Sequence, residues 1–328
     1  MNNIAEKVRA VTRSKTFRNE QQRLIQGGKG WLFAIFRLVI IVGISYVILG
    51  PLIGIISSSF FSNADKYNPM VYMIPQAPTL ERYELALLRM DYWNVLLNNM
   101  LYVLSLMVIQ LVVCSLVGYG FARFQFPFKK VLFACVIIMI VIPTHSIMLP
   151  LYMTFQNFDP LGLIGLLTGE RSVNLLMEPW PMFIMTIFAG GLRSGLYIYI
   201  FNQFFRGLPK EIEEAASVDG AGTFYTYARV MMPNAMPSII TVAIFSLVWQ
   251  YNDTFFSTLF NIKPTIVLSK QIASLQATIV NLDQVMDPSI SALYVYAGIV
   301  LAIIPLVLLY VLLQKQFIEG VERSGIVG

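Results

Sequence analysis

The chain has 328 residues, of which 57% are hydrophobic and 12% are charged. Soluble domains carry roughly 25% charged residues, so this composition excludes an ordinary soluble protein and favours a membrane protein. The formal charge of +5 is concentrated at the N-terminal end, beside an apolar run, where membrane topology explains it better than nucleic-acid binding. The sequence therefore predicts an all-α polytopic membrane protein with no nucleic-acid partner.

The cysteine and histidine content narrows the chemistry that the chain can support. Cys114 and Cys135 both lie in apolar runs, so we interpret them as core thiols rather than as a disulfide or metal pair. The single histidine, His145, is too few for a histidine-based metal cluster and argues against a Ser-His-Asp triad. The P-loop pattern GxxxxGK[ST] does not occur in the sequence. We therefore expect no enzymatic activity, no cofactor and no metal site in this chain.

Residues 1–30 form a basic tail with seven Lys and Arg residues against two Glu residues. This tail is longer than the basic start of a secretory signal peptide, and the apolar run after it is too extended. We interpret residues 1–30 as a cytoplasmic tail whose positive charges hold the N-terminus inside the cell.

Six apolar runs follow that are long enough to cross a bilayer, which requires about 20 apolar residues. The fourth run is interrupted by three glycines and Arg193, so its helix can also begin later, near Gly195. For Arg193 itself the alternatives are a side chain that faces a polar cavity or the outer interface, or a residue that merely marks a span boundary. Gly191 and Gly195 form a GxxxG step that would allow close helix contact. The predicted spans are 31–58, 95–120, 131–152, 184–205, 238–260 and 293–314.

The basic residues between the spans predict the orientation. Fifteen Lys and Arg residues fall on the side of the N-terminal tail and six on the other side. By the positive-inside rule both termini are cytoplasmic, including a C-terminal tail at 315–328, and the membrane core spans 95–314. The predicted external loops are 59–94, 153–183 and 261–292, and a folded external cap is an alternative for the first of them.

A long polar segment, 208–233, separates the fourth and fifth predicted spans. Pro209 fits the first turn of a helix, and three Glu residues follow it where the helix dipole favours negative charge. Gly220 supplies a left-handed helix stop, and a second amphipathic run, Phe224–Met232, ends before Pro233. The segment therefore predicts a surface helix, a tight turn and a second helix. The alternative is a solvated loop with incidental helicity.

The letters of this segment closely resemble the EAA signature of ATP-binding-cassette (ABC) importer permeases. Glu214-Ala215-Ala216 is followed by Gly220 and then by Val230-Met231-Met232-Pro233, at the spacing of that signature. The family prefers Ile and Leu where Val230 and Met232 stand. Asp219 and Ala221 beside the glycine are similar to the sugar-importer version, DGA. The resemblance implies a helix that docks on a separate ABC ATPase dimer, which binds ATP and Mg. The residues implied in this coupling are Glu213, Glu214, Ala215, Ala216, Asp219, Gly220, Ala221 and Pro233.

The C-terminal tail resembles that of maltose-type permeases, with the pattern Q-x-x-F-x-x-G. Gln314, Phe317 and Gly320 match this pattern, and the resemblance implies that they contact the ATPase interface. Glu322, Arg323 and Ser324 depart from the usual small-residue ending. The alternative is a frayed polar terminus.

Polar side chains inside the predicted spans are the candidates for a substrate path, because isolated polar groups are costly in lipid and usually face a bundle or cavity. Aromatic faces stack on the C–H-rich faces of sugars, while amides and carboxylates bind hydroxyls. The competing interpretation is hydrogen bonding between helices, and we interpret His145 as structural. The candidates are Asn98, Asn99, Gln110, Trp249, Gln250, Tyr251, Asn252 and Asp253.

The resemblance covers roughly residues 60–328 and implies a type I (MetI-like) ABC importer permease with about six transmembrane helices. It implies a maltose-G-like subunit of a binding-protein-dependent importer of carbohydrate, above all oligosaccharide, in a bacterial cell membrane. The expected partners are a second homologous permease, an ABC ATPase dimer, an extracytoplasmic solute-binding protein, the carbohydrate and the lipid bilayer.

Two alternatives remain at this point. One is an ABC permease for a non-sugar solute. The other is an ion-coupled secondary transporter, which would require inverted repeats and an intramembrane acid. Asp253 is the acid available for that role.

Overall fold

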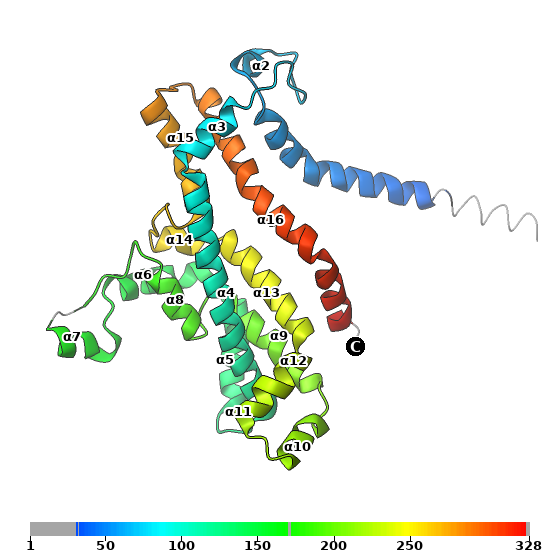
Figure 1. The fold of residues 1–328 in the computed structure, drawn as a ribbon, viewed down its shortest axis with the longest axis vertical. Coiled ribbons are helices and arrows are strands. Elements are labelled where there is room, and N and C mark those ends of the chain that lie inside the picture. Colours follow the sequence, from blue (N-terminus) through cyan, green and yellow to red (C-terminus); the bar gives the residue numbers. More distant parts are fainter. Residues whose placement is uncertain (1–30, 32, 170–171, 326–328) are drawn as a thin grey trace, which may run out of the picture.

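The computed structural model describes residues 31, 33–169 and 172–325, so the predicted tail at 1–30 lies outside the described residues. The described chain is helical and elongated, with one isolated antiparallel bridge between Phe158 and Val173 (Figure 1). The prediction of an all-α protein is confirmed.

Three helices in the described part of the chain are long and apolar enough to cross a membrane. Two further pairs of helices pass the same test but are bent, so the number of spans rises to five if each pair counts as one. The straight spans are Phe33–Ser58, Tyr92–Arg123 (α4) and Pro288–Leu312, within α16 (Pro288–Gly325). In the first bent pair, α5 (Lys129–Val141) is followed at an angle of 106° by Thr144–Gln156, which comprises η1 (Thr144–Ile147) and α6 (Met148–Gln156). In the second, Thr223–Asn234 is followed at an angle of 79° by α13 (Met236–Tyr251).

The fourth predicted span, 184–205, is not one helix, and the structure corrects this prediction. Its residues belong to α8 (Trp180–Ile187) and α9 (Ser194–Gly207). Between the two helices the chain takes positive φ values at Ala189 and Arg193, which breaks the helical path. The later start that the glycines indicated, near Gly195, is where α9 begins.

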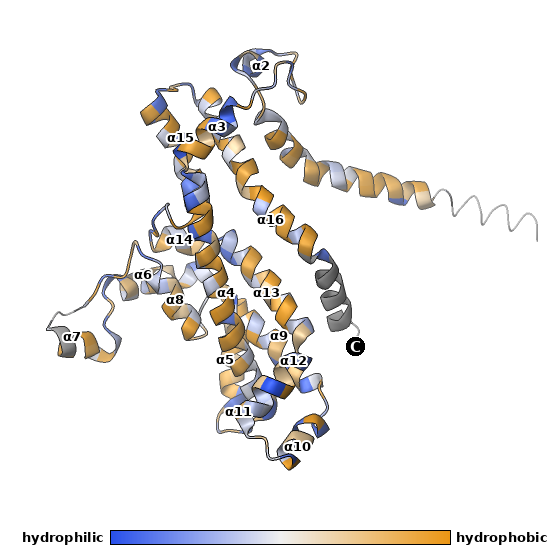
Figure 2. Ribbon diagram, in the orientation of Figure 1, coloured by the Kyte–Doolittle hydropathy of each residue, from blue (hydrophilic) through white to orange (hydrophobic). Residues whose placement is uncertain are grey.

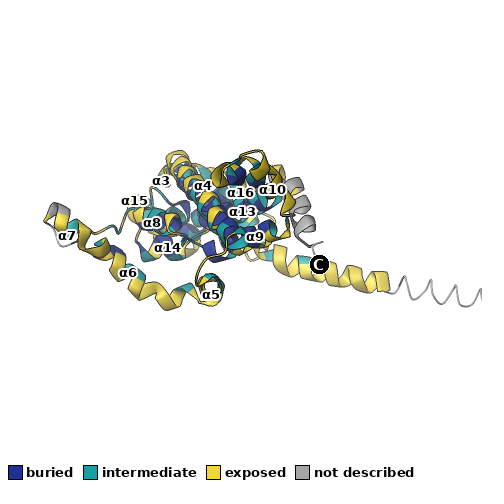
Figure 3. Ribbon diagram, turned by 90° about the horizontal axis from the view of Figure 1, so that it is seen from below, coloured by how far each residue is buried: buried dark blue, intermediate teal, exposed yellow. Residues whose placement is uncertain are grey.

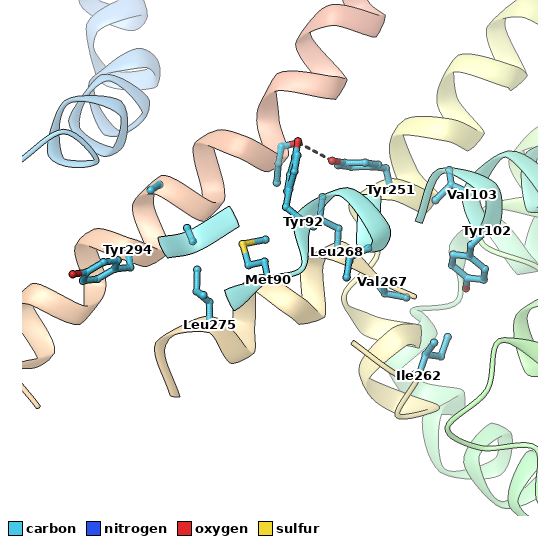
Figure 4. Packing of buried hydrophobic residues seen from close by; sticks show 14 of the residues in the cluster. Met90, Tyr92, Tyr102, Val103, Tyr251, Ile262, Val267, Leu268, Leu275 and Tyr294 are labelled. Atoms are coloured by element: carbon cyan, nitrogen blue, oxygen red, sulfur yellow. Dashed lines mark hydrogen bonds between the residues drawn. The ribbon is translucent and has the colours of Figure 1, made fainter. Parts of the chain in front are cut away.

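The long helix α4 is the centre of the bundle, and α8, α9 and α13 pack against it (Figure 1). Apolar side chains form two buried clusters along its length. The first cluster joins α4 to α3 (Glu81–Arg89), α15 (Leu268–Asp283) and α16 (Figure 4). The second cluster joins α4 to α9 and to the polar segment after α9, and it includes Tyr119, Phe201 and Phe205.

Two glycines allow close approach between helices. A Cβ on Gly118 of α4 would lie 2.6 Å from the Cβ of Phe201 in α9. A Cβ on Gly195 of α9 would lie 3.0 Å from the carbonyl oxygen of Val136 in α5. Gly191, the other half of the predicted GxxxG step, instead meets Thr186 within its own turn. The close contact predicted for this step therefore involves Gly195 alone.

The first long helix, Phe33–Ser58, extends away from the rest of the bundle (Figures 1 and 3). Its most apolar 18-residue window has no residue buried inside the chain. Figure 2 shows that this helix is hydrophobic along its length. Its apolar surface is therefore available to lipid or to another membrane subunit.

The first predicted loop, 59–94, is folded, as the alternative interpretation proposed, and forms a cap with α15 at one end of the bundle (Figure 1). Arg82 is buried there and donates to the hydroxyl of Tyr294 and to Oδ1 of Asn63. Its guanidinium carbon also lies 4.5 Å from the centre of the Tyr294 ring. Arg89 forms an ion pair with Asp283 at 2.5 Å, which joins α3 to α15.

A buried carboxylate orders the first part of this cap. Asp65 lies in α2 (Asn63–Tyr67) and accepts hydrogen bonds from the amides of Gln76 and Ala77 at 3.1 Å each. Burial acts to raise the pKa of Asp65, but the N–H groups of Ala77, Ser62 and Gln76 stabilise the carboxylate and hold its pKa below the ordinary value. The remaining short helices are η2 (Pro160–Gly162), α7 (Leu163–Thr168) and α14 (Phe255–Leu259).

Candidate coupling segment and polar interior

The predicted surface helix exists as α10 (Glu211–Val218), directly after Lys210. Three Glu residues occupy its first turn, where they interact favourably with the helix dipole. The helix stops at Gly220, which has φ +80°. The amide of Ala221 donates to the carbonyl of Ala216 at 2.9 Å, a bond that closes the end of the helix. The local prediction of a helix followed by a left-handed glycine is confirmed.

The second half of the segment is helical but not uniformly α. It comprises α11 (Thr223–Tyr225), a π-helical stretch η3 (Thr226–Met231) and α12 (Met232–Asn234). The helix therefore continues through Pro233 instead of ending before it, and the bend comes between α12 and α13. The hydroxyl of the buried Tyr227 lies 2.7 Å from Oγ of Ser115 in α4. This hydrogen bond fixes the π-helical stretch to the centre of the bundle.

The outer face of α10 is open to solvent in this chain. No residue of α10 is buried, and Glu214 and Ala215 are exposed. Val218 is 87% exposed. Figure 1 places α10 at the end of the molecule opposite the cap of α2, α3 and α15. The helix can therefore meet another protein at its outer face.

The inner face of α10 is held by an ion pair that the sequence analysis did not find. Nε of Arg123, the last residue of α4, lies 3.1 Å from Oε2 of Glu213. Arg123 also donates to the carbonyl of Leu208 at 2.8 Å. The two charged side chains are 7% and 20% exposed, respectively. Glu213 thus faces its own chain, while its neighbour Glu214 faces outward.

Gln110 is the centre of a buried polar network in the middle of the bundle. Its Nε2 donates to the carbonyl of Leu192 at 2.6 Å and to Oγ of Ser194 at 3.1 Å. Its Oε1 accepts from Ser246 at 2.7 Å and from Gln250 at 3.4 Å. Gln110 and Gln250, two of the predicted substrate-path residues, therefore connect α4, α9 and α13.

Most other predicted substrate-path residues also have partners within the chain. Asn99 is buried and its Oδ1 accepts from the amide of Leu268 at 3.3 Å. Tyr251 donates to the carbonyl of Ala302 at 2.7 Å. Asn98 is exposed and donates to the carbonyl of Thr265 at 3.0 Å. These contacts favour the competing interpretation, hydrogen bonding between segments.

Asp253 lies one residue before Thr254, the N-cap residue of α14, and its side chain binds two amides at the start of that helix. Its Oδ1 accepts from the amide of Phe256 at 3.2 Å, and its Oδ2 accepts from the amide of Ser257 at 2.9 Å. Both carboxylate oxygens of Asp253 therefore accept hydrogen bonds from backbone N–H groups of α14. This arrangement gives Asp253 a structural role at the start of α14.

Like Asn98, Trp249 and Asn252 are predicted path residues that are exposed in this chain. Both are exposed near the end of α13, and Asn252 donates to the carbonyl of Val248 in its own helix at 2.9 Å. The guanidinium carbon of Arg193 lies 4.2 Å from the centre of the Trp249 ring. Arg193, for which the sequence allowed a polar cavity, the outer interface or a span boundary, thus contacts the ring of Trp249.

The C-terminal candidates lie in α16, which continues as helix to Gly325. Gln314 is exposed. The side chain of Phe317 and the surroundings of Gly320 lie outside the described residues. The described residues contain no cluster of three or more His, Cys, Asp or Glu side chains that could hold a metal ion.

Residues 114–323 match the family described as binding-protein-dependent transport system inner membrane component. A probable ABC transporter permease of Pyrococcus horikoshii is 26% identical over 281 residues, or 85% of this chain and 92% of that protein. The diacetylchitobiose uptake system permease protein NgcG of Streptomyces coelicolor is 26% identical, with 85% of this chain and 84% of that protein covered. The maltodextrin transport system permease protein MdxG of Bacillus subtilis is 27% identical over 250 residues, or 76% and 81%.

The fold is similar to that of a solved bacterial ABC transporter involved in the import of the acidic polysaccharide alginate. The match has a TM-score of 0.69 at 19% sequence identity, and it covers 87% of this chain and 96% of that chain.

Proposed function

The chain belongs to the family of binding-protein-dependent transport system inner membrane components, and on this premise we propose that it is a permease subunit of an ATP-driven carbohydrate importer. In this role it forms one half of the translocation path. Oligosaccharides are the proposed substrates, because relatives that match most of the chain carry names such as diacetylchitobiose and maltodextrin transport permeases.

The observation that carries this proposal is the exposed helix α10, held between two helices of the bundle. It follows α9 after a few residues and leads through Gly220 and η3 into α13. A displacement of α10 by a cytosolic partner would therefore move both α9 and α13. Rigid-body motion of packed helices is an established form of domain rearrangement. Its proposed source is closure of a separate ABC ATPase dimer, which binds the ATP and Mg.

The proposed assembly also contains a second, homologous permease and an extracytoplasmic solute-binding protein. The unburied apolar surface of the first helix and the exposed side of α13 support a second membrane subunit. In this assembly the exposed outward residues of α10, chiefly Glu214 and Ala215, meet the ATPase. Glu213 holds α10 on α4 from the inside. We retain Gln314, Phe317 and Gly320 as proposed tail contacts with the ATPase.

The test is the ATPase activity of the complex purified from its native membrane, with the co-purifying subunits identified by mass spectrometry. The loaded binding protein should stimulate ATP hydrolysis in the wild-type complex. Glu214→Lys and Gly220→Pro should reduce this stimulation while the chain stays inserted. Glu211→Gln, at an exposed position of the same helix, is the matched control. Wild-type stimulation in both test variants, or purification without any ATPase, would reject the proposal.

The proposed orientation places α10 in the cytoplasm and the cap outside. Val218 and Met70 are well suited to a labelling test, because they are 87% and 85% exposed at opposite ends. In a Cys135→Ala background, Val218→Cys should react with a membrane-impermeant maleimide only after the cells are opened. Met70→Cys should react in intact cells. The reverse pattern would overturn the orientation.

The structure gives little support to ion-coupled transport. Both carboxylate oxygens of Asp253 accept amide N–H groups of α14, so this acid is engaged at the start of that helix. Uptake that persists without ATP and collapses with the proton or sodium gradient would favour the ion-coupled alternative.

A further inference from the structure

Arg193 is an exposed charged residue at the start of α9, and it has no acidic partner in the described chain. The ion pairs of the described residues are Arg89–Asp283, Arg123–Glu213 and Lys263–Glu178. Arg193 takes part in none of them, and its side chain is exposed. Its close neighbour is the ring of Trp249, at 4.2 Å from the guanidinium carbon.

The contacts of its neighbours place Arg193 beside the middle part of α4, a helix that is long and apolar enough to cross a membrane. The residues on either side of it, Leu192 and Ser194, both accept hydrogen bonds from Gln110. Gln110 lies in α4 between Tyr92 and Arg123. At 1.5 Å per residue, Gln110 is about 27 Å from the first end of this helix and about 20 Å from the other. Neither end of α4 is close to Arg193.

An arginine at this depth is not expected to face lipid. A charged side chain at the centre of a bilayer costs about 2.5–3.5 kcal/mol on insertion scales and more by other estimates. Such residues face a bundle interior or a water-filled path, and they mark the routes of substrates and ions. The exposed side of Arg193 therefore faces the translocation path or the second permease.

Trp249, which contacts Arg193, and Asn252, which follows Trp249 by three residues, have the chemistry of a site for sugars. Trp249 is 42% exposed, which leaves ring surface for stacking against a sugar. Asn252 is exposed three residues further along the same chain segment, and its side-chain oxygen can accept from a hydroxyl group. The guanidinium lies over the Trp249 ring and forms no ion pair in the described chain, and a guanidinium can bind an anion in bidentate geometry through two N–H groups.

We propose that Arg193, Trp249 and Asn252 form a binding site for a sugar unit that carries an acidic group. The inference rests on the proposed function and names its substrate class. Trp249 stacks on the sugar ring, Asn252 binds a hydroxyl group, and Arg193 binds the carboxylate of a uronic acid or the phosphate of a phosphorylated sugar. The cation–π contact holds the guanidinium in place before the substrate arrives.

The test measures equilibrium binding to the complete transporter in lipid nanodiscs, without nucleotide and without the binding protein. The probes are trigalacturonate, the same trisaccharide with its carboxyl groups reduced to alcohols, and glucose 6-phosphate. The first two differ only in charge and in the oxygens that carry it. The wild-type complex should bind an acidic probe at least about tenfold more tightly than the neutral one, as expected for hydrogen bonds to a charged group. Preference for the uronate or for the phosphate identifies the source of the charge.

Three variants separate the site from general effects of charge. Arg193→Gln should abolish the preference for acidic probes, and Arg193→Lys should retain part of it, because a lysine is charged but not bidentate. Trp249→Leu should weaken binding of both trisaccharides through lost stacking, and it should also lower the preference for acidic probes, because the guanidinium loses its cation–π contact. Arg37→Gln is the matched control, since Arg37 is an exposed arginine in another membrane helix.

Several outcomes would overturn the site. Equal binding of acidic and neutral probes would do so, as would a preference that survives in Arg193→Gln. Loss of the second permease from the Arg193→Gln complex would show that Arg193 pairs with an acid of that subunit instead. The ATPase measurement distinguishes the two proposals. If the binding protein stimulates ATP hydrolysis while no acidic preference is found, the site fails and the importer role stands.

Discussion

Arg123 at the end of α4 and Glu213 in α10 form an ion pair, with 3.1 Å between Nε and Oε2. The pair connects α4, the central helix of the bundle, to α10, an exposed helix at the end of the molecule opposite the cap (Figure 1). A displacement of α10 is thereby transmitted directly to α4, in addition to the chain connections through α9 and α13.

We therefore expect this ion pair to set the position of α10. Arg123→Met or Glu213→Gln leaves one buried polar group without its partner, at a cost of about 1–3 kcal/mol, reduced here because Glu213 is partly exposed. Each variant should lower binding-protein-stimulated ATPase activity several-fold. The exchange Arg123→Glu with Glu213→Arg should restore part of it. An exchange no better than the single variants would contradict the positioning role.

Gly118 should be intolerant of any side chain, because α9 is too close. A Cβ at this position lies 2.6 Å from the Cβ of Phe201, so Gly118→Ala should destabilise the bundle by about 1–3 kcal/mol. Gly120 offers a control in the same helix, since nothing lies within 4 Å of a Cβ there. Thermal unfolding in detergent should show a lower Tm for Gly118→Ala and no loss for Gly120→Ala. Equal Tm values would show that α4 and α9 can separate at little cost.

Gly220 should be required for its backbone conformation rather than for space. Its φ of +80° strains any residue with a side chain, while a Cβ there would meet no atom within 4 Å. Gly220→Ala should displace α10 and reduce stimulated ATPase activity, with little effect on insertion. Gly222→Ala is the control, because Gly222 is equally open but has φ −69°. Loss of coupling in both variants would point to crowding against the partner instead.

The cap should lose stability in acid through Asp65. The folded pKa of Asp65 is lower than its ordinary value, so its contribution is complete above about pH 4 and is lost as the pH falls through the folded pKa. Asp65→Asn should lower the Tm at pH 6, and the difference from wild type should shrink toward pH 3. Glu81→Gln, at an exposed position of the same cap, is the control. A constant difference across this range would exclude the carboxylate as the cause.

The elements that were predicted well have strong local signals. The helix α10 and its stop follow from Pro209, the three Glu residues and Gly220, all within twelve residues. The long apolar run that became α4 was placed at 95–120, close to its observed bounds of Tyr92 and Arg123. In these cases the residues that determine the structure are neighbours in the sequence.

The bends between helices were harder to predict, because hydropathy depends on which residues are present and carries no information on where the helix axis changes direction. The run 131–152 is predominantly apolar, with Thr144, His145 and Ser146 as a short polar interruption, yet its helix ends at Val141 and the chain bends by 106° before η1. Proline disfavours helical geometry in the residue before it, so the signal was present but weak. In the fourth run the break depends on positive φ at Ala189 and Arg193, which no propensity scale favours at these residues.

The roles of polar residues depended on contacts between distant segments. Gln110 and Trp249 were both candidates for the substrate path, and the sequence could not separate them. The structure buries Gln110 among three helices and leaves Trp249 exposed beside Arg193. Arg123 was counted as a topological charge, because nothing in its neighbourhood indicates a partner in α10.

The Gln110 network also limits how the bundle can move. Separating α4, α9 and α13 would strip a buried amide of its partners, at about 1–3 kcal/mol for each group left unpaired. A transport cycle that repeats many times avoids such a penalty most simply by carrying these three helices together as a block. The flexing then falls to the joints outside the block, where α5 meets η1 and where α12 meets α13. The centre of the permease is thus its most rigid part, and we expect conformational change at the two bends, between α5 and η1 and between α12 and α13.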